Sequence, residues 1–137
     1  METPCKVYTD GSCLHNPGPG GWAFLVVPCD EKGTVIEKSG GEYKTTNNRM
    51  ELQAVIEALI FISNEHVSIH TDSLWVLNCA SGAWKRKANL DLWAQFDEAV
   101  REKQVTWTWV RGHSGHFYNE RVDKLARQKA IKYQSLY

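Results

Sequence analysis

The chain has 137 residues, and its 16 lysine and arginine residues are balanced by 16 aspartate and glutamate residues. This length fits one domain, and a hydrophobic content of 42% is typical of a folded rather than a disordered chain. The zero net charge argues against a uniformly basic nucleic-acid coat protein. The charge is unevenly distributed, however: residues 1–83 hold 5 bases and 10 acids, and residues 84–137 hold 11 bases and 6 acids.

The cysteines and the apolar segments indicate where the protein resides. The four cysteines lie far apart, so their spacing indicates neither a zinc knuckle nor a redox motif. No apolar run approaches the roughly 20 residues that cross a bilayer, and the first residues lack the pattern of a signal peptide. We therefore expect a cytoplasmic protein with free thiols, no membrane association, and a single domain over residues 1–137.

The hydrophobic pattern predicts strands and helices in alternation. Strands are expected at residues 5–10, 22–28 and 34–43, with a glycine-rich turn at residues 11–21 between the first two. Helical spacing follows at residues 48–62, and then a strand at residues 67–72. The remaining expected elements are helices at 73–80, 90–103 and 119–133 and a strand at 104–110. This order predicts an α/β protein with a mixed sheet and helices on its faces.

Two aspartates follow predicted strands. Asp10 ends the first strand and Asp72 ends the fourth, so both carboxylates emerge at one sheet edge if these strands are parallel neighbours. Each also has an ordinary explanation, since Asp10 could be a turn residue and Asp72 could cap the following helix. Together they favour a site.

Two further acids cannot be assigned from their surroundings alone. Glu51 follows Asn48 at the spacing of a helix capping box. Asp123 lies near the start of the last predicted helix, where an acidic residue is favoured by the helix dipole. Both explanations remain open at this point.

Two other motifs bear on the possible chemistry. The loop Gly112-His113-Ser114-Gly115-His116 has two histidines, and a proton carrier fits it better than a zinc site because no cysteine is near. The segment Gly18-Pro-Gly-Gly-Trp-Ala23 matches the dinucleotide-binding expression, but a strand rather than a helix is expected to follow it. With no phosphate-binding loop of the NTPase type in the sequence, a nucleotide cofactor is not indicated.

Five spaced blocks of the sequence resemble type 1 ribonucleases H. In chain order they are Tyr8-Thr-Asp-Gly-Ser-Cys-Leu-His-Asn-Pro-Gly-Pro-Gly-Gly-Trp22, Thr46-Asn-Asn-Arg-Met-Glu-Leu52, Thr71-Asp-Ser73, Asp91-Leu-Trp93, and Trp109-Val-Arg-Gly-His-Ser-Gly-His116 with Asn119-Glu-Arg-Val-Asp123. The resemblance extends from Lys6 to about Ala130. It implies a ribonuclease H-like fold, with a five-stranded mixed sheet in the order 3-2-1-4-5. It also implies an endonuclease that cuts the RNA strand of RNA–DNA hybrids.

The same resemblance implies a set of functional residues. The catalytic carboxylates would be Asp10, Glu51, Asp72 and Asp123, which would hold two Mg²⁺ ions, with Mn²⁺ as a substitute. Hard oxygen ligands suit Mg²⁺, and two ions about 3.5–4 Å apart can stabilise both the attacking and the leaving oxygen. The products would carry 5′-phosphate and 3′-hydroxyl ends. His113 would assist proton transfer or product release.

The resemblance also implies which residues bind the hybrid. Contacts to the RNA strand would come from Gly11, Ser12, Cys13, Asn16, Asn47 and Asn48, since amides can both donate to and accept from a 2′-hydroxyl. Lys44 and Thr46 would hold a phosphate of the DNA strand, and Trp75 would line the DNA-binding channel.

The sequence departs from many bacterial relatives in one region. They carry a long basic segment between two middle helices, whereas here residues 83–90 include only Lys85, Arg86 and Lys87. Affinity for the hybrid is then expected to be weak, or to come from the basic residues of the last helix, Arg121, Lys124, Arg127, Lys129 and Lys132. Leu74 stands where a glutamine is common. We expect a monomer.

Three alternatives stay open from the sequence. Transposases, integrases and resolvases share the fold and its acidic sites. A nucleic-acid-binding module without activity, and a pocket for a small metabolite, are the other two.

Overall fold

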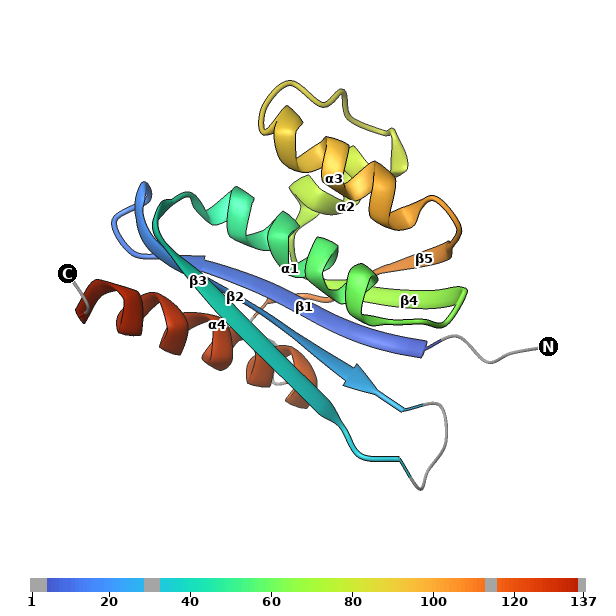
Figure 1. Ribbon diagram of the computed structural model, residues 1–137, viewed down its shortest axis with the longest axis horizontal. Coiled ribbons are helices and arrows are strands. Elements are labelled where there is room, and N and C mark those ends of the chain that lie inside the picture. Colours follow the sequence, from blue (N-terminus) through green and yellow to red (C-terminus); the bar gives the residue numbers. More distant parts are fainter. Residues whose placement is uncertain (1–4, 29–32, 113–115, 136–137) are drawn as a thin grey trace.

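The computed structural model describes residues 5–28, 33–112 and 116–135, and these form a five-stranded sheet with helices on both faces (Figure 1). The strands are β1 (Cys5–Cys13), β2 (Gly18–Val27), β3 (Ile36–Thr45), β4 (His66–Thr71) and β5 (Gln104–Trp109). The helices are α1 (Asn47–Phe61), α2 (Leu74–Ser81), α3 (Leu90–Val100) and α4 (Phe117–Ser135).

The sheet is mixed, and its strand order is β3-β2-β1-β4-β5, which confirms the predicted order. β2 pairs antiparallel with β1 and with β3. The chain then crosses over through α1, and β4 pairs parallel with β1 and β5 parallel with β4. β1 is therefore the central strand, and its parallel border with β4 brings the ends of these two strands together.

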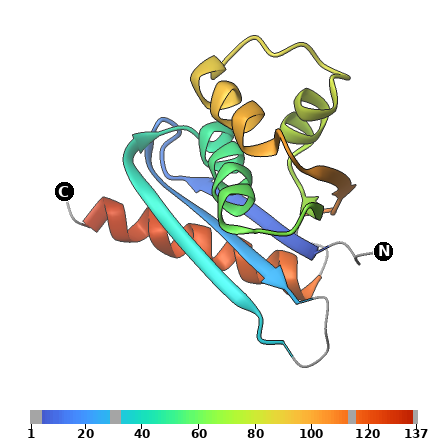
Figure 2. The same ribbon diagram turned by 45° about the vertical axis from the view of Figure 1, so that its right-hand side comes forward.

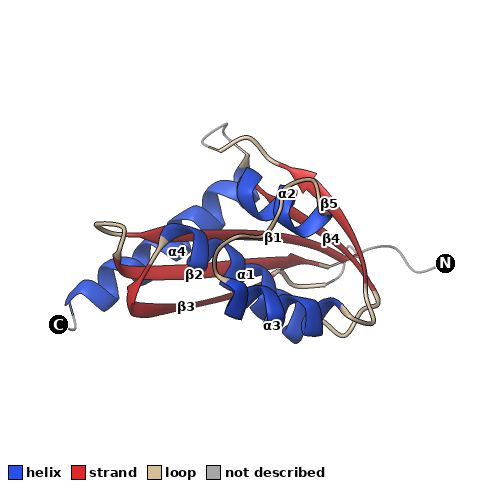
Figure 3. Cartoon of the chain, turned by 90° about the horizontal axis from the view of Figure 1, so that it is seen from above, coloured by secondary structure: helices blue, strands red, loops and turns tan. Residues whose placement is uncertain are grey.

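The helices form two layers around this sheet. α1, α2 and α3 cover one face and α4 covers the other (Figures 1 and 2). Seen from above, α1 and α3 lie next to each other, and α2 lies over β4 and β5 (Figure 3). None of the helices in the described residues is long and apolar enough to cross a membrane.

Both faces of β1 are buried. Val7 points into the core under α1, α2 and α3, and the next residue, Tyr8, points into the smaller core under α4. Successive side chains of a strand alternate between faces, so β1 contributes to both cores at once. Functional groups on this strand are thereby held in a closely packed environment.

The prediction of a turn at residues 11–21 is wrong at both of its ends. Gly11–Cys13 continue β1, and Gly18–Gly21 begin β2. The glycines there serve close packing: a Cβ atom built on Gly21 would lie 2.2 Å from the carbonyl oxygen of Ala126 in α4. Glycine allows a backbone to approach this closely, and the sequence alone does not distinguish that use from a turn.

Candidate active site

Asp10 and Asp72 meet at the border of the two central parallel strands. The last pair in the β1–β4 register is Tyr8 with His70, and continuing the register by two residues places Asp10 opposite Asp72. Asp10 lies within β1 and is 2% exposed, whereas Asp72 directly follows β4. The pairing of these two strands therefore brings the two acids together, as their positions in the sequence predict.

Glu51 reaches the same place from α1. Gly11 makes this possible, because a Cβ atom at Gly11 would lie 2.3 Å from the backbone nitrogen of Glu51. The bare backbone of β1 lets α1 pack directly against it. As a result, Asp10, Glu51 and Asp72 each offer a carboxylate oxygen, and these oxygens all lie within 4.8 Å of one another.

The ordinary explanations for Glu51 and Asp72 are wrong. Helix α1 begins at Asn47 and is capped by Thr46, whose side chain accepts from the backbone N–H of Arg49 at 3.2 Å. Glu51 therefore lies beyond the position that a capping box requires. Helix α2 is capped by Ser73, which accepts from the N–H of Val76 at 3.1 Å, rather than by Asp72.

The environment of the cluster opposes ionisation. Burial raises the pKa of Asp10 from its ordinary value to about 8, a hydrogen bond with Glu51 lowers it, and the charges of Asp72 and Asp123 raise it further. Burial likewise raises the pKa of Glu51 well above its usual range, and the nearby Asp10 and Asp72 add to this effect. Three acids that repel one another in a desolvated place would be stabilised by a cation.

The chemistry of the donors fits a hard divalent metal ion. The Oε2 atom of Glu51 is buried and has no hydrogen-bond partner among the described residues. Buried polar atoms are normally paired, so this carboxylate oxygen is available to coordinate a cation. Oxygen atoms from Asp and Glu are the ligands that Mg²⁺, Ca²⁺ and Mn²⁺ prefer, so the three residues could hold such an ion.

Asp123 approaches the cluster from the opposite layer. It is half-buried on α4, and both a hydrogen bond and its charge raise the pKa of Asp10. Acids from β1, α1, the end of β4 and α4 thus converge on one place, although they are distributed over most of the sequence. His113, the fifth residue predicted for this site, lies outside the described residues.

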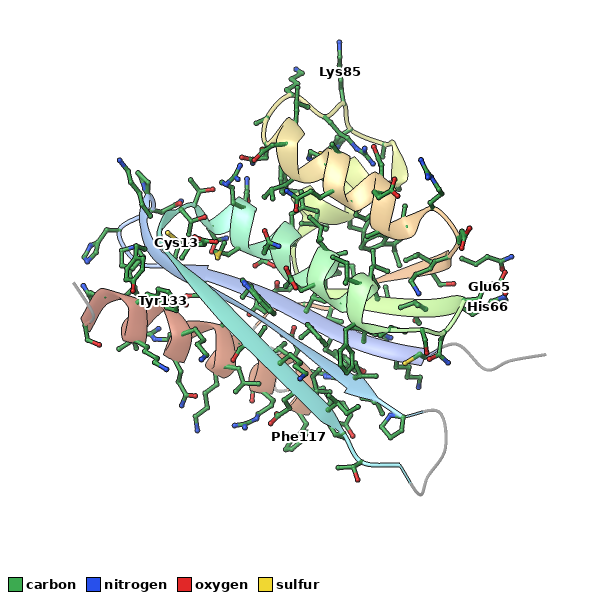
Figure 4. The ribbon with its side chains drawn as sticks, viewed as in Figure 1. Cys13, Glu65, His66, Lys85, Phe117 and Tyr133 are labelled. Carbon is green, nitrogen blue, oxygen red and sulfur yellow. The ribbon has the colours of Figure 1, made fainter. Side chains whose placement is uncertain are left out.

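The predicted RNA contacts gather at one end of the sheet. Asn16 accepts through its Oδ1 atom from the backbone N–H of Asn47 at 2.9 Å, which links the turn after β1 to the first turn of α1. The thiol of Cys13 donates to the carbonyl oxygen of Thr45 at 3.3 Å, beside that turn (Figure 4). The set brought together comprises Gly11, Ser12, Cys13, Asn16, Asn47 and Asn48, and Thr46, predicted to hold a DNA phosphate, is the N-cap residue directly before Asn47.

Of the two remaining predicted contacts, Lys44 adjoins this end of the sheet and Trp75 lies on α2. Lys44 is exposed near the end of β3, one residue before Thr45. Trp75 is half-buried on α2, and its ring packs against Trp93 of α3 with 5.5 Å between the ring centroids. Trp75 therefore packs against the core, and its side chain is only partly available to a ligand.

Two residues that support Asp72 were missed in the sequence. The indole Nε1 of Trp109 donates to the carbonyl oxygen of Asp72 at 3.3 Å. A Cβ atom at Gly112 would lie 3.0 Å from Asp72 Oδ2, so the glycine leaves room for this carboxylate. The pairing of Thr71 with Trp109 in the β4–β5 register is the signal that would have indicated the first contact.

The basic residues predicted to bind the hybrid are not equally available. Lys85 projects away from the loop between α2 and α3 (Figure 4). In contrast, Arg86 stacks over Trp93 and pairs with Asp97 at 2.9 Å, and Arg121 of α4 pairs with Glu37 of β3. α4 packs on the face of the sheet opposite α1. Its C-terminal end approaches the turn after β1, where Nε2 of Gln134 lies 3.3 Å from Nε2 of His15.

The site and its surroundings agree with comparisons to known proteins. The family model described as RNase H matches residues 2–131. A protein of Pseudomonas putida strain W619, named Ribonuclease H, is 46% identical over 142 residues, covering 93% of this chain and 94% of its own length.

Solved structures share the architecture. The N-terminal RNase H domain of a Mycobacterium tuberculosis protein superposes with a TM-score of 0.83 at 27% identity, covering 97% of this chain and 99% of its own. LC11-RNase H1, solved in complex with an RNA/DNA hybrid, gives a TM-score of 0.79 at 26% identity, covering 93% of this chain and 97% of its own. With a family model that matches almost the whole sequence and relatives this similar, the chain belongs to the RNase H family, as a ribonuclease H of type 1.

Proposed function

We propose that this protein is a metal-dependent endonuclease that hydrolyses the RNA strand of RNA–DNA hybrids and leaves 5′-phosphate and 3′-hydroxyl ends. The observation that carries the proposal is the group formed by buried Asp10 and Glu51 with half-buried Asp72, next to a surface of amide side chains. Support also comes from LC11-RNase H1, a relative solved with an RNA/DNA hybrid.

In this proposal four carboxylates hold the metal: Asp10, Glu51, Asp72 and Asp123. Two Mg²⁺ ions bound there, or two Mn²⁺ ions, would polarise the scissile phosphate, activate the attacking water and stabilise the departing 3′ oxygen. The protein's part is to keep the acids close together, and a bound cation would favour their ionised form. Glu51 and Asp10 are desolvated by their packing, so their oxygens have few competitors for a cation.

In this proposal His113 carries a proton to or from the reacting atoms. A histidine side chain has an unperturbed pKa of about 6.5, which suits uptake and release near neutral pH. It would serve the water or the leaving oxygen, whereas the carboxylates would serve the metal. Its loss would then slow the reaction without removing metal binding.

Recognition of the hybrid is assigned to the end of the sheet near α1. Asn16, Asn47 and Asn48 would meet the RNA strand, because an amide can both donate to and accept from the 2′-hydroxyl that DNA lacks. The backbone and small side chains of Gly11, Ser12 and Cys13 would form part of the same surface. Lys44 and Thr46 would hold a phosphate of the DNA strand, with Trp75 further along it.

The proposal includes the state of the protein. Residues 1–137 would act as one catalytic domain and as a monomer, because all of the acids assigned to the site come from a single chain. We place its activity in the cytoplasm, where Cys5, Cys13 and Cys79 would remain free thiols.

The test is a cleavage assay on an end-labelled RNA–DNA hybrid, with Mg²⁺, with Mn²⁺ and with EDTA. Single-stranded RNA, duplex RNA and duplex DNA of the same sequence serve as controls. We expect cleavage of the RNA strand of the hybrid only, with product ends that accept a label at the 3′-hydroxyl. Cleavage of duplex DNA would instead favour a transposase-like activity, and metal-independent binding without cleavage would indicate a binding module.

A further inference from the structure

Arg49 connects the beginning of α1 to the beginning of α3. Its guanidinium donates from Nη1 to Asp91 Oδ1 at 3.0 Å and from Nη2 to Asp91 Oδ2 at 2.8 Å. Nη1 also donates to Oδ1 of Asn89 at 3.2 Å. The two helices start at the same end of the molecule, so this contact joins their first turns (Figure 1).

The start of α3 is arranged for this contact. Asn89 occupies the N-cap position of α3 in the left-handed region, with φ 58° and ψ 38°. An asparagine at this position normally accepts from an N–H of its own helix, but within the described residues Asn89 makes no such cap bond. Its oxygen accepts from Arg49 instead, so helix capping is given up for a bond between helices.

Stability alone does not explain the arrangement. The side chains of Arg49 and Asp91 are 33% and 60% exposed, and exposed ion pairs contribute little to folding stability. The two-pronged geometry adds directional restraint, which a single point contact does not. Arg49 also holds the pKa of Asp91 at about 2, so the carboxylate stays ionised over the working pH range.

The first turn of α1 is held from its other side as well. The N–H of Asn47 donates to Asn16, and the N–H of Arg49 donates to the hydroxyl of Thr46. The bond to Asn16 fixes the turn relative to β1, and the bonds of the Arg49 guanidinium to Asp91 and Asn89 fix it relative to α3. Asn47 and Asn48 lie in this doubly held turn.

We infer that the contact of Arg49 with Asp91 and Asn89 positions the first turn of α1 so that Asn47 and Asn48 meet the RNA strand. This inference rests on the proposed function. Arg49 is a positioning residue here, acting through its neighbours. Glu51, in contrast, is held by the burial of α1 against the sheet, so the contact should govern binding of the hybrid more than the chemical step.

The test compares two matched variants on α3, Asp91→Asn and Asp97→Asn. Asp97 pairs with Arg86 at 2.9 Å, and the side chains of Arg86 and Asp97 are 26% and 59% exposed, so this pair matches the Arg49–Asp91 pair in chemistry and exposure while its arginine comes from the loop before α3 rather than from α1. Both changes remove one negative charge, which by itself favours attraction to the polyanionic hybrid, so a rise in KM would need another cause. We would measure kcat and KM on one RNA–DNA hybrid with Mg²⁺, and Tm for each protein.

We expect Asp91→Asn to raise KM about five- to tenfold with kcat within about twofold of wild type, whereas Asp97→Asn changes neither by more than about twofold. Arg49→Lys, which keeps the charge but loses the fork, should raise KM by a similar factor. The double variant Arg49→Lys/Asp91→Asn should be no worse than either single one, because one interaction can be lost only once.

The outcomes separate the inference from the proposed function. A wild-type protein that leaves the hybrid intact would refute the function itself. With an active wild type, an unchanged KM in Asp91→Asn, an equal rise in both asparagine variants, or a fall in kcat at constant KM would overturn the positioning role. Equal changes of Tm in the two variants, together with a rise in KM for Asp91→Asn alone, would support it.

Discussion

Replacing Asp10 by asparagine should stabilise the metal-free protein while it removes a proposed metal ligand. The pKa of Asp10 in the folded protein is about 8, mainly because of burial, against about 3.9 for an unfolded chain. Each unit of difference corresponds to about 1.4 kcal/mol. Asparagine has nearly the same shape and never ionises, so the variant avoids the free-energy cost of burying a carboxylate that is charged in the unfolded chain.

The effect depends on pH in a definite direction. Between about pH 4 and pH 8 the folded protein binds a proton at Asp10 that the unfolded chain has already lost. Stability of the wild type therefore falls as the pH rises through this window, and below about pH 4 the two states bind the proton equally. Asp10→Asn does not lose stability in this way. The difference in the free energy of unfolding between the variant and the wild type should therefore be near zero at pH 4 and should grow toward pH 7.

The size of the stability gain in Asp10→Asn follows from the same pKa difference. Three pH units between pH 4 and pH 7 give a ceiling of about 4 kcal/mol. Glu51 and Asp72 share the cluster and relax when one charge is removed, so we expect about 2–4 kcal/mol at pH 7. For a domain of this size, this corresponds to a rise in Tm on the order of 10 °C.

The assay is thermal and urea unfolding of both proteins in EDTA at pH 4, 5.5 and 7, repeated at pH 7 with Mg²⁺. Glu102→Gln serves as a control, since Glu102 is an exposed carboxylate outside the cluster. Added Mg²⁺ should reduce the difference in stability between the variant and the wild type, because a ligand that binds the folded wild type stabilises it by mass action. A variant less stable than wild type at pH 7 in EDTA, or an advantage equal at pH 4 and pH 7, would refute the reasoning.

Three further predictions concern packing, catalysis and binding. Gly11→Ala should destabilise the fold by about 2–3 kcal/mol and abolish cleavage, because the new Cβ atom would lie 2.3 Å from the backbone of α1 and would displace Glu51. Unfolding and cleavage assays check this prediction. A stable and active variant would contradict it. His113→Ala should lower kcat about 10²–10³-fold and leave Mg²⁺ binding by calorimetry unchanged, whereas a lost metal affinity would argue against a proton-transfer role. The logarithm of the hybrid affinity, measured by anisotropy in EDTA, should fall with the logarithm of the salt concentration at a slope of about −2 to −4. A slope steeper than about −6 would contradict the small number of phosphate contacts that the short segment at residues 83–90 implies.

The residues themselves predicted part of the site. Asp10 and Asp72 follow predicted strands, and parallel pairing of those strands was enough to place them side by side. Glu51 and Asp123 could not be placed in this way, because each had an ordinary role on its own helix. Only the resemblance between spaced blocks linked the four acids. The structure adds the physical reason: α1 and α4 pack on opposite faces of β1 and direct Glu51 and Asp123 toward it.

The two errors at the strand ends share a cause. Glycine is ambiguous in a sequence, since it marks turns and also permits close contact between backbones. At Gly11 and Gly21 the second use applies, so two strands run further than predicted. The start of α1 was placed one residue late because both Thr46 and Asn48 are good capping residues, and only the three-dimensional contact shows that Thr46 is used.

The central claim is that a buried carboxylate cluster binds metal and cuts the RNA strand of a hybrid. The most direct measurement compares wild type and Glu51→Gln on an end-labelled RNA–DNA hybrid, with Mg²⁺ and with EDTA. The account predicts RNA-strand cleavage by the wild type only when Mg²⁺ is present, and a loss of at least about 10³-fold in the variant while its Tm in EDTA is unchanged or higher. Cleavage by Glu51→Gln at the wild-type rate, or cleavage by the wild type in EDTA, would contradict it.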